Sequence, residues 1–547
     1  MGRVRHPGEA VNTPRTPSTP EPVAGVGPEP VAGVVTGPAA DLVAAEDVLL
    51  FVNAAITATG QREFRSDADE QRLSLEFLHT YVRVNYRRVY AASLALDINH
   101  HNAALIVRGL LETAGEASPE ERRTEGRLIA ARLALLPPPR VYRLFGELRR
   151  AKVNNRRTRA IMRDWLAARP DLGHDAVKYR TGLKTAVRHI HLPCPDGSGP
   201  LAEIGAFLFR PGRLRRYEHG MLDAWRRAHY EQGAVSELPF TVAEGFAGRH
   251  GMKREVFLKR AAPRMTRLER LRTQEVRAAV RRPGSPVVDV DLTVMPLTRL
   301  ALYVLSLSFE QRAERRAELT GALRAAARRA AGAHAGSWGR VHAVLDDSFS
   351  SSGSGQKRRR PLAVALACHH LLEVLAAPGA YRGLWTSGAG DALLVRPWGP
   401  TPLGMRILDA LESGGCRGDR AASGGPEAIG TTPSSPGAAV PDRLVIVSDG
   451  WDNAPAGLAG EVLRVWRQRL DPARRTAVVH VNPVYDTAGF DVRRLAAGVA
   501  TAGIRDAEDL PALVEIARFA EGRSGPEELS AYLDRRVARF TGVGGGT

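Results

Sequence analysis

The residues best suited to chemistry lie in the last third of the chain, at Asp346, Ser348 and Ser350. They follow the apolar run 341–345 in the spacing Asp-x-Ser-x-Ser, so a single loop presents one carboxylate and two hydroxyls. Hard divalent cations favour oxygen ligands and keep bound waters at the remaining positions. We therefore predict a divalent-cation site at this loop, with Mg²⁺ as the expected cation and Mn²⁺ as the alternative.

Two further loops add oxygen ligands to the same predicted site. Thr401 lies in the segment 399–404, and Asp449 closes a second apolar run at 444–448. Because buried parallel strands of an α/β sheet bind ligands at their carboxyl ends, we expect all five side chains to meet at one edge. The neighbouring Asp347 and Asp452 receive no role and are expected to be loop acids that face solvent.

The elements that position these loops alternate between strand and helix. We predict strands at 341–345, 444–448 and 476–484, two short strands within 381–398, and helices at 361–376, 510–519 and 526–540. This alternation is typical of a doubly wound α/β domain, which we place at 338–525. Residues 413–440 are rich in Gly, Ser and Pro and are expected to form a disordered insertion. Residues 526–547 are assigned to a C-terminal helix and tail.

The chain upstream of this domain is predicted to be all-α. In the first long helix, Leu73, Phe77, Tyr81 and Val84 recur at helical spacing and are expected to form its apolar face. Further helices are predicted at 103–113, 125–136, 141–152, 156–168 and 309–331. No strand pattern interrupts them, which favours stacked helix pairs over residues 45–335. Residues 1–44, rich in Pro and Gly, are predicted to be a disordered tail.

The positive charge of the chain is concentrated in the middle. The formal net charge is +18, and residues 140–282 hold 32 Lys and Arg against 14 Asp and Glu. An Arg-rich composition accounts for part of this excess but not for its position. A localised basic segment is what a polyanionic partner such as nucleic acid requires.

Several residues of the basic segment are candidates for contact with RNA. Cationic side chains would neutralise phosphates, and aromatic or imidazole rings would stack on unpaired bases. Packing between helices is an equally strong interpretation for Tyr179, and Arg264, Arg267 and Arg270 fit a solvated helix face equally well. The predicted RNA-binding set is Arg156, Arg157, Arg159, Lys178, Tyr179, Arg180, Arg188 and His191.

The order of the local signatures resembles the TROVE module of the Ro autoantigen family, followed by a von Willebrand factor A (vWA) domain. The signatures are residues 155–166, 177–180, 188–193, 238–246, 263–272 and 295–303, with the five-residue site after them. The resemblance covers roughly residues 45–525. It implies a ring of HEAT-like helical repeats, a vWA domain whose five oxygen ligands form a metal-ion-dependent adhesion site (MIDAS), and binding of noncoding RNA without catalysis. Pro193 lies one position earlier than in the family motif.

These features favour a ribonucleoprotein component over an enzyme. We find no nucleophile elbow, Walker loop, zinc motif or dinucleotide fingerprint, and Cys194, Cys368 and Cys416 lie too far apart in sequence to indicate a disulfide framework. We expect a cytoplasmic protein without membrane contact. It would bind Y-like RNA or single-stranded ends of structured or misfolded RNA, as a chaperone or as an adaptor for an exoribonuclease. The alternative is a vWA interaction module that captures an acidic partner beside a MoxR-type ATPase.

Overall fold

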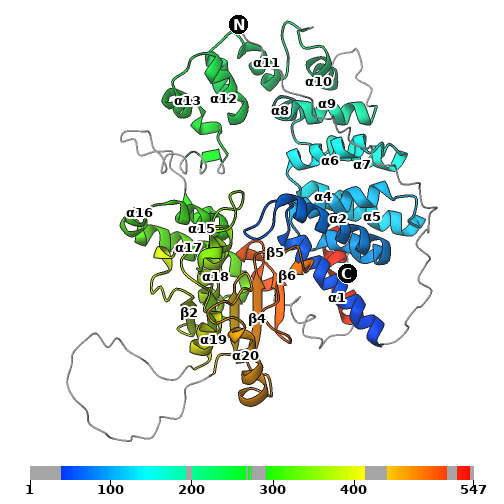
Figure 1. The fold of residues 1–547 in the computed structure, drawn as a ribbon. Coiled ribbons are helices and arrows are strands. Elements are labelled where there is room, and N and C mark those ends of the chain that lie inside the picture. Colours follow the sequence, from blue (N-terminus) through cyan, green and yellow to red (C-terminus); the bar gives the residue numbers. More distant parts are fainter. Residues whose placement is uncertain are drawn as a thin grey trace, which may run out of the picture.

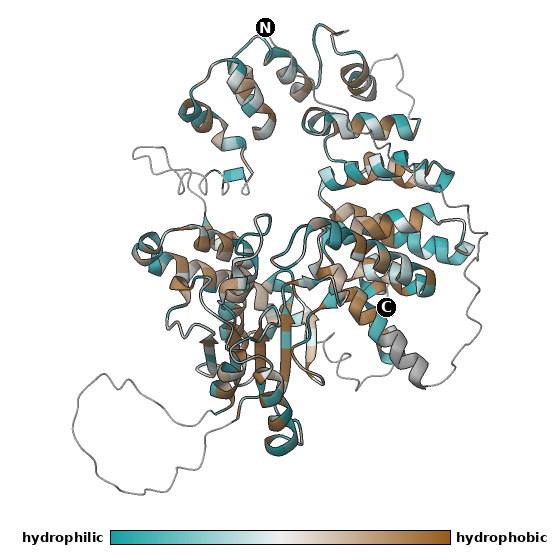
Figure 2. Cartoon of the chain, in the orientation of Figure 1, coloured by the Kyte–Doolittle hydropathy of each residue, from teal (hydrophilic) through white to brown (hydrophobic). Residues whose placement is uncertain are grey.

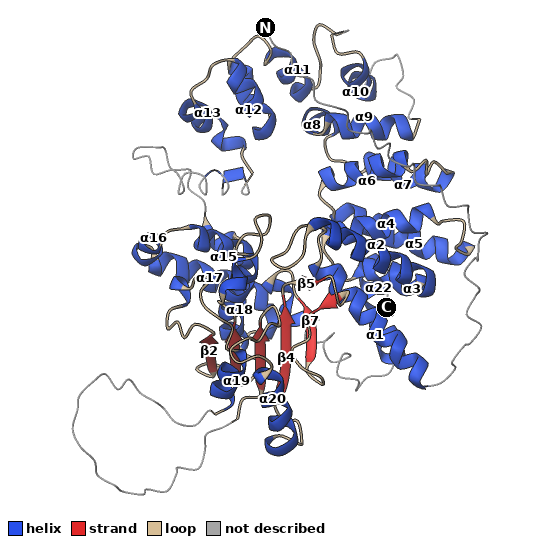
Figure 3. Cartoon of the chain, viewed as in Figure 1, coloured by secondary structure: helices blue, strands red, loops and turns tan. Residues whose placement is uncertain are grey.

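The computed structural model describes residues 38–191, 200–212, 214–266, 269–270, 273, 291–412, 440–513 and 526–542. Within these ranges a long helical region precedes a parallel sheet, and Figure 3 shows the strands confined to one part of the molecule. The predicted combination of an all-α region and an α/β domain is confirmed at this level. Residues 38–44 begin a helix instead of extending the predicted tail. Residues 1–37, and 413–439 of the predicted insertion, lie outside the described ranges.

The helical region forms a curved stack (Figure 1). Helix packs on helix along the stack, with α4 on α6, α6 on α9 and α8 on α11. Local signals set the helix starts: at α5, Ser118 and Glu121 form a capping box and Pro119 occupies the first turn. The helices are α1 (Pro38–Thr57), α2 (Ala68–Asn85), α3 (Arg87–Ala92), α4 (His100–Glu112), α5 (Pro119–Leu135), α6 (Pro138–Arg150), α7 (Arg156–Ala167), α8 (Leu172–Lys178), α9 (Arg180–His189), α10 (Pro200–Phe209), α11 (Gly220–Arg227), α12 (Phe240–Arg249), α13 (Arg254–Ala261), α15 (Leu297–Ser306), α16 (Phe309–Glu314) and α17 (Arg316–Ala331).

Helix α2 buries a different face from the predicted one. Leu73, Phe77 and Val84 are all more than half exposed, so the predicted apolar stripe is wrong. Polar residues are buried instead because they find partners: His79 Nδ1 hydrogen-bonds the Tyr90 hydroxyl at 2.9 Å. The buried side chains of α2 are Gln71, Ser74, Leu75, Leu78, His79 and Val82.

The sheet has five parallel strands in the order β2-β1-β3-β4-β7. Side chains alternate between its two faces, so Ala343 packs with the helices on one side and Val344 with those on the other. Helix α18 (Arg360–Leu375) covers the first face, and α19 (Leu403–Leu411) and α20 (Leu458–Val465) cover the second. In Figure 2 the strands are predominantly apolar. The strands are β1 (Val341–Leu345), β2 (Tyr381–Trp385), β3 (Arg443–Val447), β4 (Ala477–Asn482) and β7 (Ala500–Gly503), beside a two-stranded ribbon of β5 (Tyr485–Asp486) and β6 (Asp491–Val492).

The strand predictions hold for β1, β3 and β4 but fail within residues 381–398, at β7 and at the ribbon of β5 and β6. Residues 381–398 contain one strand, β2, followed by a 3₁₀ turn at Ala392–Leu394, so the second predicted strand is absent. Gly388 has a positive φ of 80°, and this left-handed turn ends the extended run. The edge strand β7 was not predicted, because its sequence of Ala, Thr and Gly lacks the large β-branched residues that mark a buried strand.

Helices near both ends of the described chain join the helical region to the α/β region. Helix α1 packs against β6 and β7, where Asn53 Oδ1 accepts a hydrogen bond from the Gly503 amide at 2.9 Å. The last helix, α22 (Pro526–Thr541), packs on α1, α3 and α5. Helices α15 and α17, which precede the predicted boundary near residue 335, pack on α18.

Candidate metal edge and basic groove

The predicted cation ligands lie where the order of the strands in the sheet reverses. The chain passes from β1 to β2 on one side and then returns to β3 on the other, so the ends of β1 and β3 flank a topological switch point. Leu345 pairs with Val447 across these strands, and Asp346 and Asp449 follow within two residues. Ligands of open α/β sheets bind in the crevice that such a switch point creates.

The edge cluster, Asp346, Ser348, Ser350, Thr401 and Asp449, is buried throughout. The Ser348 amide donates to Asp346 Oδ1 at 2.9 Å, and the Ser348 and Ser350 hydroxyls lie 3.3 Å apart. The Ser350 side chain also lowers the pKa of Asp449, so it lies close to that carboxylate. Four of the five predicted ligands therefore lie together, three of them joined by hydrogen bonds.

Thr401 reaches the same place through its loop. The Phe349 amide donates to the Gly399 carbonyl at 3.0 Å, which ties the two loops together. The Thr401 amide donates to Asn453 Oδ1 at 2.7 Å, so the loop is also fixed to the segment that follows Asp449. Two backbone segments thus hold Thr401 beside the other four residues.

The electrostatics of the edge cluster fit a cation. Burial, and then the charge of Asp449, raise the pKa of Asp346 to about 7. Burial also raises the pKa of Asp449, opposed by Ser350, by the Trp451 amide and by the guanidinium groups of Arg65 and Arg493. Two buried carboxyls and three hydroxyls match the oxygen ligands of Mg²⁺. In the described part of the chain no three His, Cys, Asp or Glu side chains form a metal cluster.

The two neighbouring acids are not the solvent-facing residues that the sequence indicated. Asp347 is buried, and its carboxylate accepts hydrogen bonds from the Thr386 hydroxyl at 2.8 Å and the Ser387 hydroxyl at 2.6 Å. Asp452 is half-buried and accepts a hydrogen bond from the Ala459 amide in the first turn of α20 at 2.6 Å. Both acids fix the loops of the edge because they satisfy buried donors.

The predicted RNA-binding residues fall into two groups. Lys178, Tyr179 and Arg180 lie at the junction of α8 and α9, where they border a hollow of about 380 Å³. The others lie around the start of α7 and the end of α9, which approach each other because the buried His189 ring hydrogen-bonds the Val153 carbonyl. This second group is Arg156, Arg157, Arg159, Arg188 and His191.

Several members of the predicted set already have partners within the protein. Arg157 pairs with the buried Glu125 at 3.3 Å, and Lys178 pairs with Glu269 at 3.6 Å. Arg180 donates to the Phe207 carbonyl at 2.8 Å and is half-buried. Arg156, Arg188 and His191 are exposed, with no ion pair among the described residues. Tyr179 is half-buried, with its ring centroid 5.8 Å from that of Tyr142.

The structure adds cationic residues that sequence reasoning missed. A second hollow of about 350 Å³ lies between α2, α4 and α6, and Arg143 borders both hollows, so we treat them as one groove. Among the described residues, neither Arg140 nor Arg143 makes an ion pair, and burial and their charges lower the pKa of His101 to about 4. The i, i+3 spacing of Arg140 and Arg143 at the start of α6 was the available sequence signal.

Comparisons with known proteins give no family for this chain. Neither a protein-family model nor a curated protein matches it. Among the helices that the structure describes, none combines the length and apolar character needed to cross a membrane.

Proposed function

We propose that the protein binds RNA, with a single-stranded segment held in the groove between α2, α4, α6 and the junction of α8 and α9. The observation that carries this proposal is the pair Arg140 and Arg143, which lie in the groove without an ion pair among the described residues. Arg140 is half-buried and Arg143 is exposed, on a wall that also holds Asp69, Glu76 and Glu147. Two guanidinium groups without an ion pair can each contact a phosphate, so an anionic ligand is favoured there. Tyr179 borders the same groove and is half-buried, so its ring offers a partly exposed face for base stacking, whereas Tyr142 beneath it is buried.

The biological role that fits this arrangement is that of a Ro/TROVE-type ribonucleoprotein. The curved helical stack supports a HEAT-like ring, and the edge cluster at the switch point supports a vWA domain with a metal-ion-dependent adhesion site. Noncoding RNA in the cytoplasm would be the ligand, and an exoribonuclease or another protein would bind at the edge cluster. We assign no catalytic residue. The protein would act as an RNA chaperone or adaptor.

The edge cluster would hold Mg²⁺ through Asp346 and Asp449 with the hydroxyls of Ser348, Ser350 and Thr401. A bound cation supplies an electrophilic position that can accept a carboxylate from a partner. The chain's own residues orient the site: Asp347 fixes the loop after β2, and Asn453 fixes the loop that carries Thr401.

A second function, capture of an acidic protein partner without RNA, is favoured by one observation. Phe349 and Trp398 flank the edge loops and are each 62% exposed. Exposed aromatic side chains beside an electrophilic site are typical of a protein-binding surface. This is the arrangement that a vWA module working with a MoxR-type ATPase would need.

The test of RNA binding is a charge reversal in the groove. The double variant Arg140→Glu and Arg143→Glu should weaken binding of an RNA duplex with a 3′ single-stranded tail by about tenfold or more, because two phosphate contacts are replaced by repulsion. Binding is measured by fluorescence anisotropy across a salt series. In wild type the logarithm of affinity should fall steeply with the logarithm of salt, by about 0.7 per phosphate neutralised.

The matched control reverses two exposed arginines of the α/β domain, Arg464→Glu and Arg469→Glu, with the same change in net charge. It should retain the wild-type affinity. If both double variants lose affinity equally, binding depends on overall charge and the groove is not the site. If wild type fails to bind the RNA and binds an acidic peptide in Mg²⁺, the second function is the correct one.

A further inference from the structure

One segment of the helical region reaches from the groove to the edge cluster. We call residues 60–68, which follow α1 and end at the first residue of α2, the strap. Both of its ends line the groove, through Gly60 and Ala68. Its middle, residues 62–65, contacts the loops that carry the predicted cation ligands. The strap therefore touches both candidate sites.

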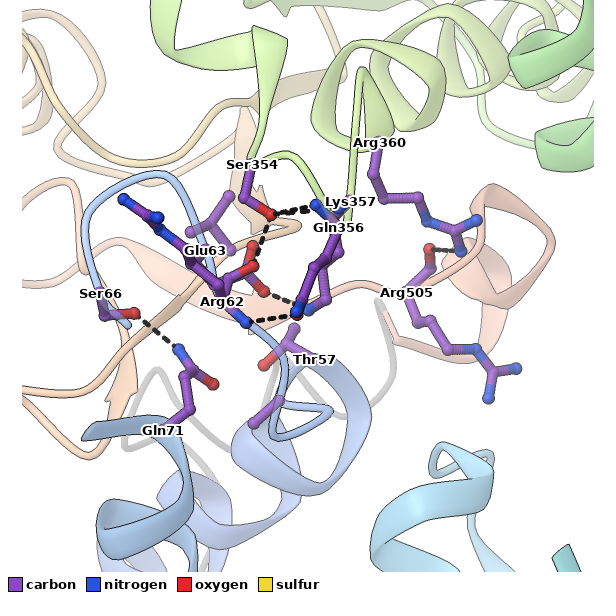
Figure 4. Close-up of polar contacts among 12 residues, drawn as sticks. Thr57, Arg62, Glu63, Ser66, Gln71, Ser354, Gln356, Lys357, Arg360 and Arg505 are labelled. Atoms are coloured by element: carbon purple, nitrogen blue, oxygen red, sulfur yellow. Dashed lines mark hydrogen bonds and ion pairs between the residues drawn. The ribbon is translucent and has the colours of Figure 1, made fainter. Parts of the chain in front are cut away.

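Polar contacts hold the strap to the segment that follows Ser350 (Figure 4). The Arg62 amide donates to Gln356 Oε1 at 3.1 Å, and the Ser354 hydroxyl donates to the Arg62 carbonyl at 2.6 Å. Glu63, which is buried, forms an ion pair with Lys357. These contacts fix the position of the strap against the first edge loop.

Ring contacts extend the attachment to both carboxylate-bearing loops. Phe64 meets Phe349, which lies between Ser348 and Ser350, edge to face at 6.0 Å. The Arg65 guanidinium lies 3.9 Å from the ring centroid of Trp451, and Arg493 lies 3.7 Å from it. The Trp451 amide in turn donates to Asp449 Oδ1 at 3.0 Å. Trp451 therefore lies between Arg65 and the predicted cation ligand Asp449.

Both ends of the strap are in turn connected to residues near or in the groove. Ser66 Oγ accepts a hydrogen bond from Gln71 Nε2 in α2 at 2.8 Å, and the Glu63 amide donates to the Ser66 carbonyl at 3.0 Å. Gly60 has a positive φ of 65°, and a Cβ there would lie 3.0 Å from the His101 ring. A shift of the strap would therefore displace His101 and the start of α2, which both line the groove.

We propose that the strap couples the two sites, so that a divalent cation at the edge cluster strengthens RNA binding in the groove through Phe64 and Arg65. This inference rests on the proposed RNA-binding function. Without a cation, the Asp449 carboxylate attracts Arg65 and holds the strap on Trp451. When a cation neutralises Asp346 and Asp449, this attraction is lost, the strap loosens, and the groove wall at Gly60 and Ala68 can adjust to RNA.

The experiment measures affinity for the tailed RNA duplex with Mg²⁺ and with EDTA at matched ionic strength. Asp449→Ala supplies the reference, because the direct effect of Mg²⁺ on the RNA is common to both proteins. The increase in RNA affinity caused by Mg²⁺ should be about fivefold or more greater in wild type than in Asp449→Ala, which is the usual size of coupling between two sites. By reciprocity, RNA should tighten Mg²⁺ binding by the same factor in calorimetry.

The variant Arg65→Ala, which is exposed and outside the groove and the edge cluster, should bind RNA tightly with or without Mg²⁺. The control Arg464→Ala removes an exposed arginine from α20 and should keep the wild-type response. The proposal is overturned if Arg65→Ala responds to Mg²⁺ as wild type does, if wild type and Asp449→Ala respond equally, or if wild type binds no Mg²⁺.

Amide hydrogen exchange separates this proposal from the proposed function. In the absence of RNA, Mg²⁺ should speed exchange in residues 61–66 of wild type and leave Asp449→Ala unchanged. If no variant binds RNA, the proposed function is refuted, and unchanged exchange in the strap would refute the coupling as well. Faster exchange would still identify the strap as an element that responds to the cation.

Discussion

Adjacent aspartates after β1 have different tasks. Asp346 contributes to the edge cluster, whereas the Asp347 carboxylate accepts hydrogen bonds from the Thr386 hydroxyl, the Ser387 amide and the Ser387 hydroxyl. Thr386 also donates to Asp346 Oδ1 at 3.3 Å. By accepting a hydrogen bond from Thr386, Asp347 holds the Thr386 hydroxyl against Asp346. One carboxylate thus positions the environment of the other.

Replacing Asp347 with Asn should destabilise the protein by about 1–3 kcal/mol, because the amide nitrogen cannot accept and a buried donor loses its partner. Urea denaturation measures the loss. Ser387→Ala removes only a donor and should cost less. An Asp347→Asn variant as stable as wild type would show that these hydrogen bonds contribute nothing.

Asp509 provides a prediction for the dependence of stability on pH. Burial raises its pKa to about 7, and Oδ2 has no hydrogen-bond partner among the described residues. Because the folded-state pKa is above the unfolded value, the ionised carboxylate costs stability as pH rises from about 4 to 7. Asp509→Asn should therefore gain stability relative to wild type between pH 5 and 8, by about 2 kcal/mol. Thermal melts at both pH values test this, and a pH-independent difference contradicts it.

The sequence identified the edge cluster better than the groove. The five oxygen-bearing residues each follow a strand or sit in a short loop, and the sheet brings those loops together by its topology alone. Arg140 and Arg143 offer only an i, i+3 spacing, which does not by itself mark a binding site. Their significance depends on which of the many arginines lack an acidic partner, and pairs such as Arg157 with Glu125 join residues far apart in sequence. Only the packed structure determines that pairing.

At the scale of elements, the contact between α1 and β7 depends on one small residue. A Cβ at Gly503 would lie 2.8 Å from Thr57 Cγ2 and 2.9 Å from the Asn53 carbonyl oxygen. The helix therefore approaches the edge strand as closely as a backbone allows. This close approach lets Asn53 Oδ1 accept a hydrogen bond from the Gly503 amide, while Asn53 Nδ2 donates to Asp491 Oδ1 at 3.0 Å.

Gly503→Ala should destabilise the protein by about 1–3 kcal/mol, the usual cost of overpacking a tight interface. Gly460→Ala is the control, because a Cβ there meets Ala496 at an ordinary 3.7 Å and alanine favours the helix. Chemical denaturation of the two variants measures the contrast. Equal stabilities would show that α1 can move away from β7 without cost.

The elements that sequence analysis missed share a physical cause. Strand β7 and the buried face of α2 both depend on partners distant in sequence: β7 on α1, and Ser74 on the Tyr485 hydroxyl at 2.6 Å. Hydrophobic periodicity reports only which faces are apolar. It identified α18, β1 and β3, whose apolar content is high, and failed where small or polar residues are buried.

At the scale of the whole molecule, α22 completes the helical region from the far end of the chain. Leu529, Tyr532 and Leu533 are buried in its contact with α1, α3 and α5. Arg88 on α3 pairs with Asp534 at 2.9 Å, and Arg536 pairs with Asp97 at 2.8 Å. The first and last helices therefore belong to one packed unit.

Truncation after residue 525 should destabilise this unit by roughly 4 kcal/mol or more, because three large side chains lose their burial. Hydrogen exchange should rise in α1, α3 and α5 while α19 and α20 keep their protection. Truncation after residue 542 is the control and should leave stability unchanged. Uniform loss of protection across the chain would show that the protein unfolds as a single unit.

The interlocking of the chain ends also constrains how the protein folds during synthesis. Asn53 meets Gly503 across 450 positions of sequence, so α1 leaves the ribosome long before β7 exists. At a translation rate of about 5–20 residues per second, the face of α1 that packs on β7 stays without this partner for roughly 20–90 s. A nascent chain in this state presents an apolar helix to solvent, and a chaperone that shields α1 until residue 503 emerges should raise the yield of folded protein.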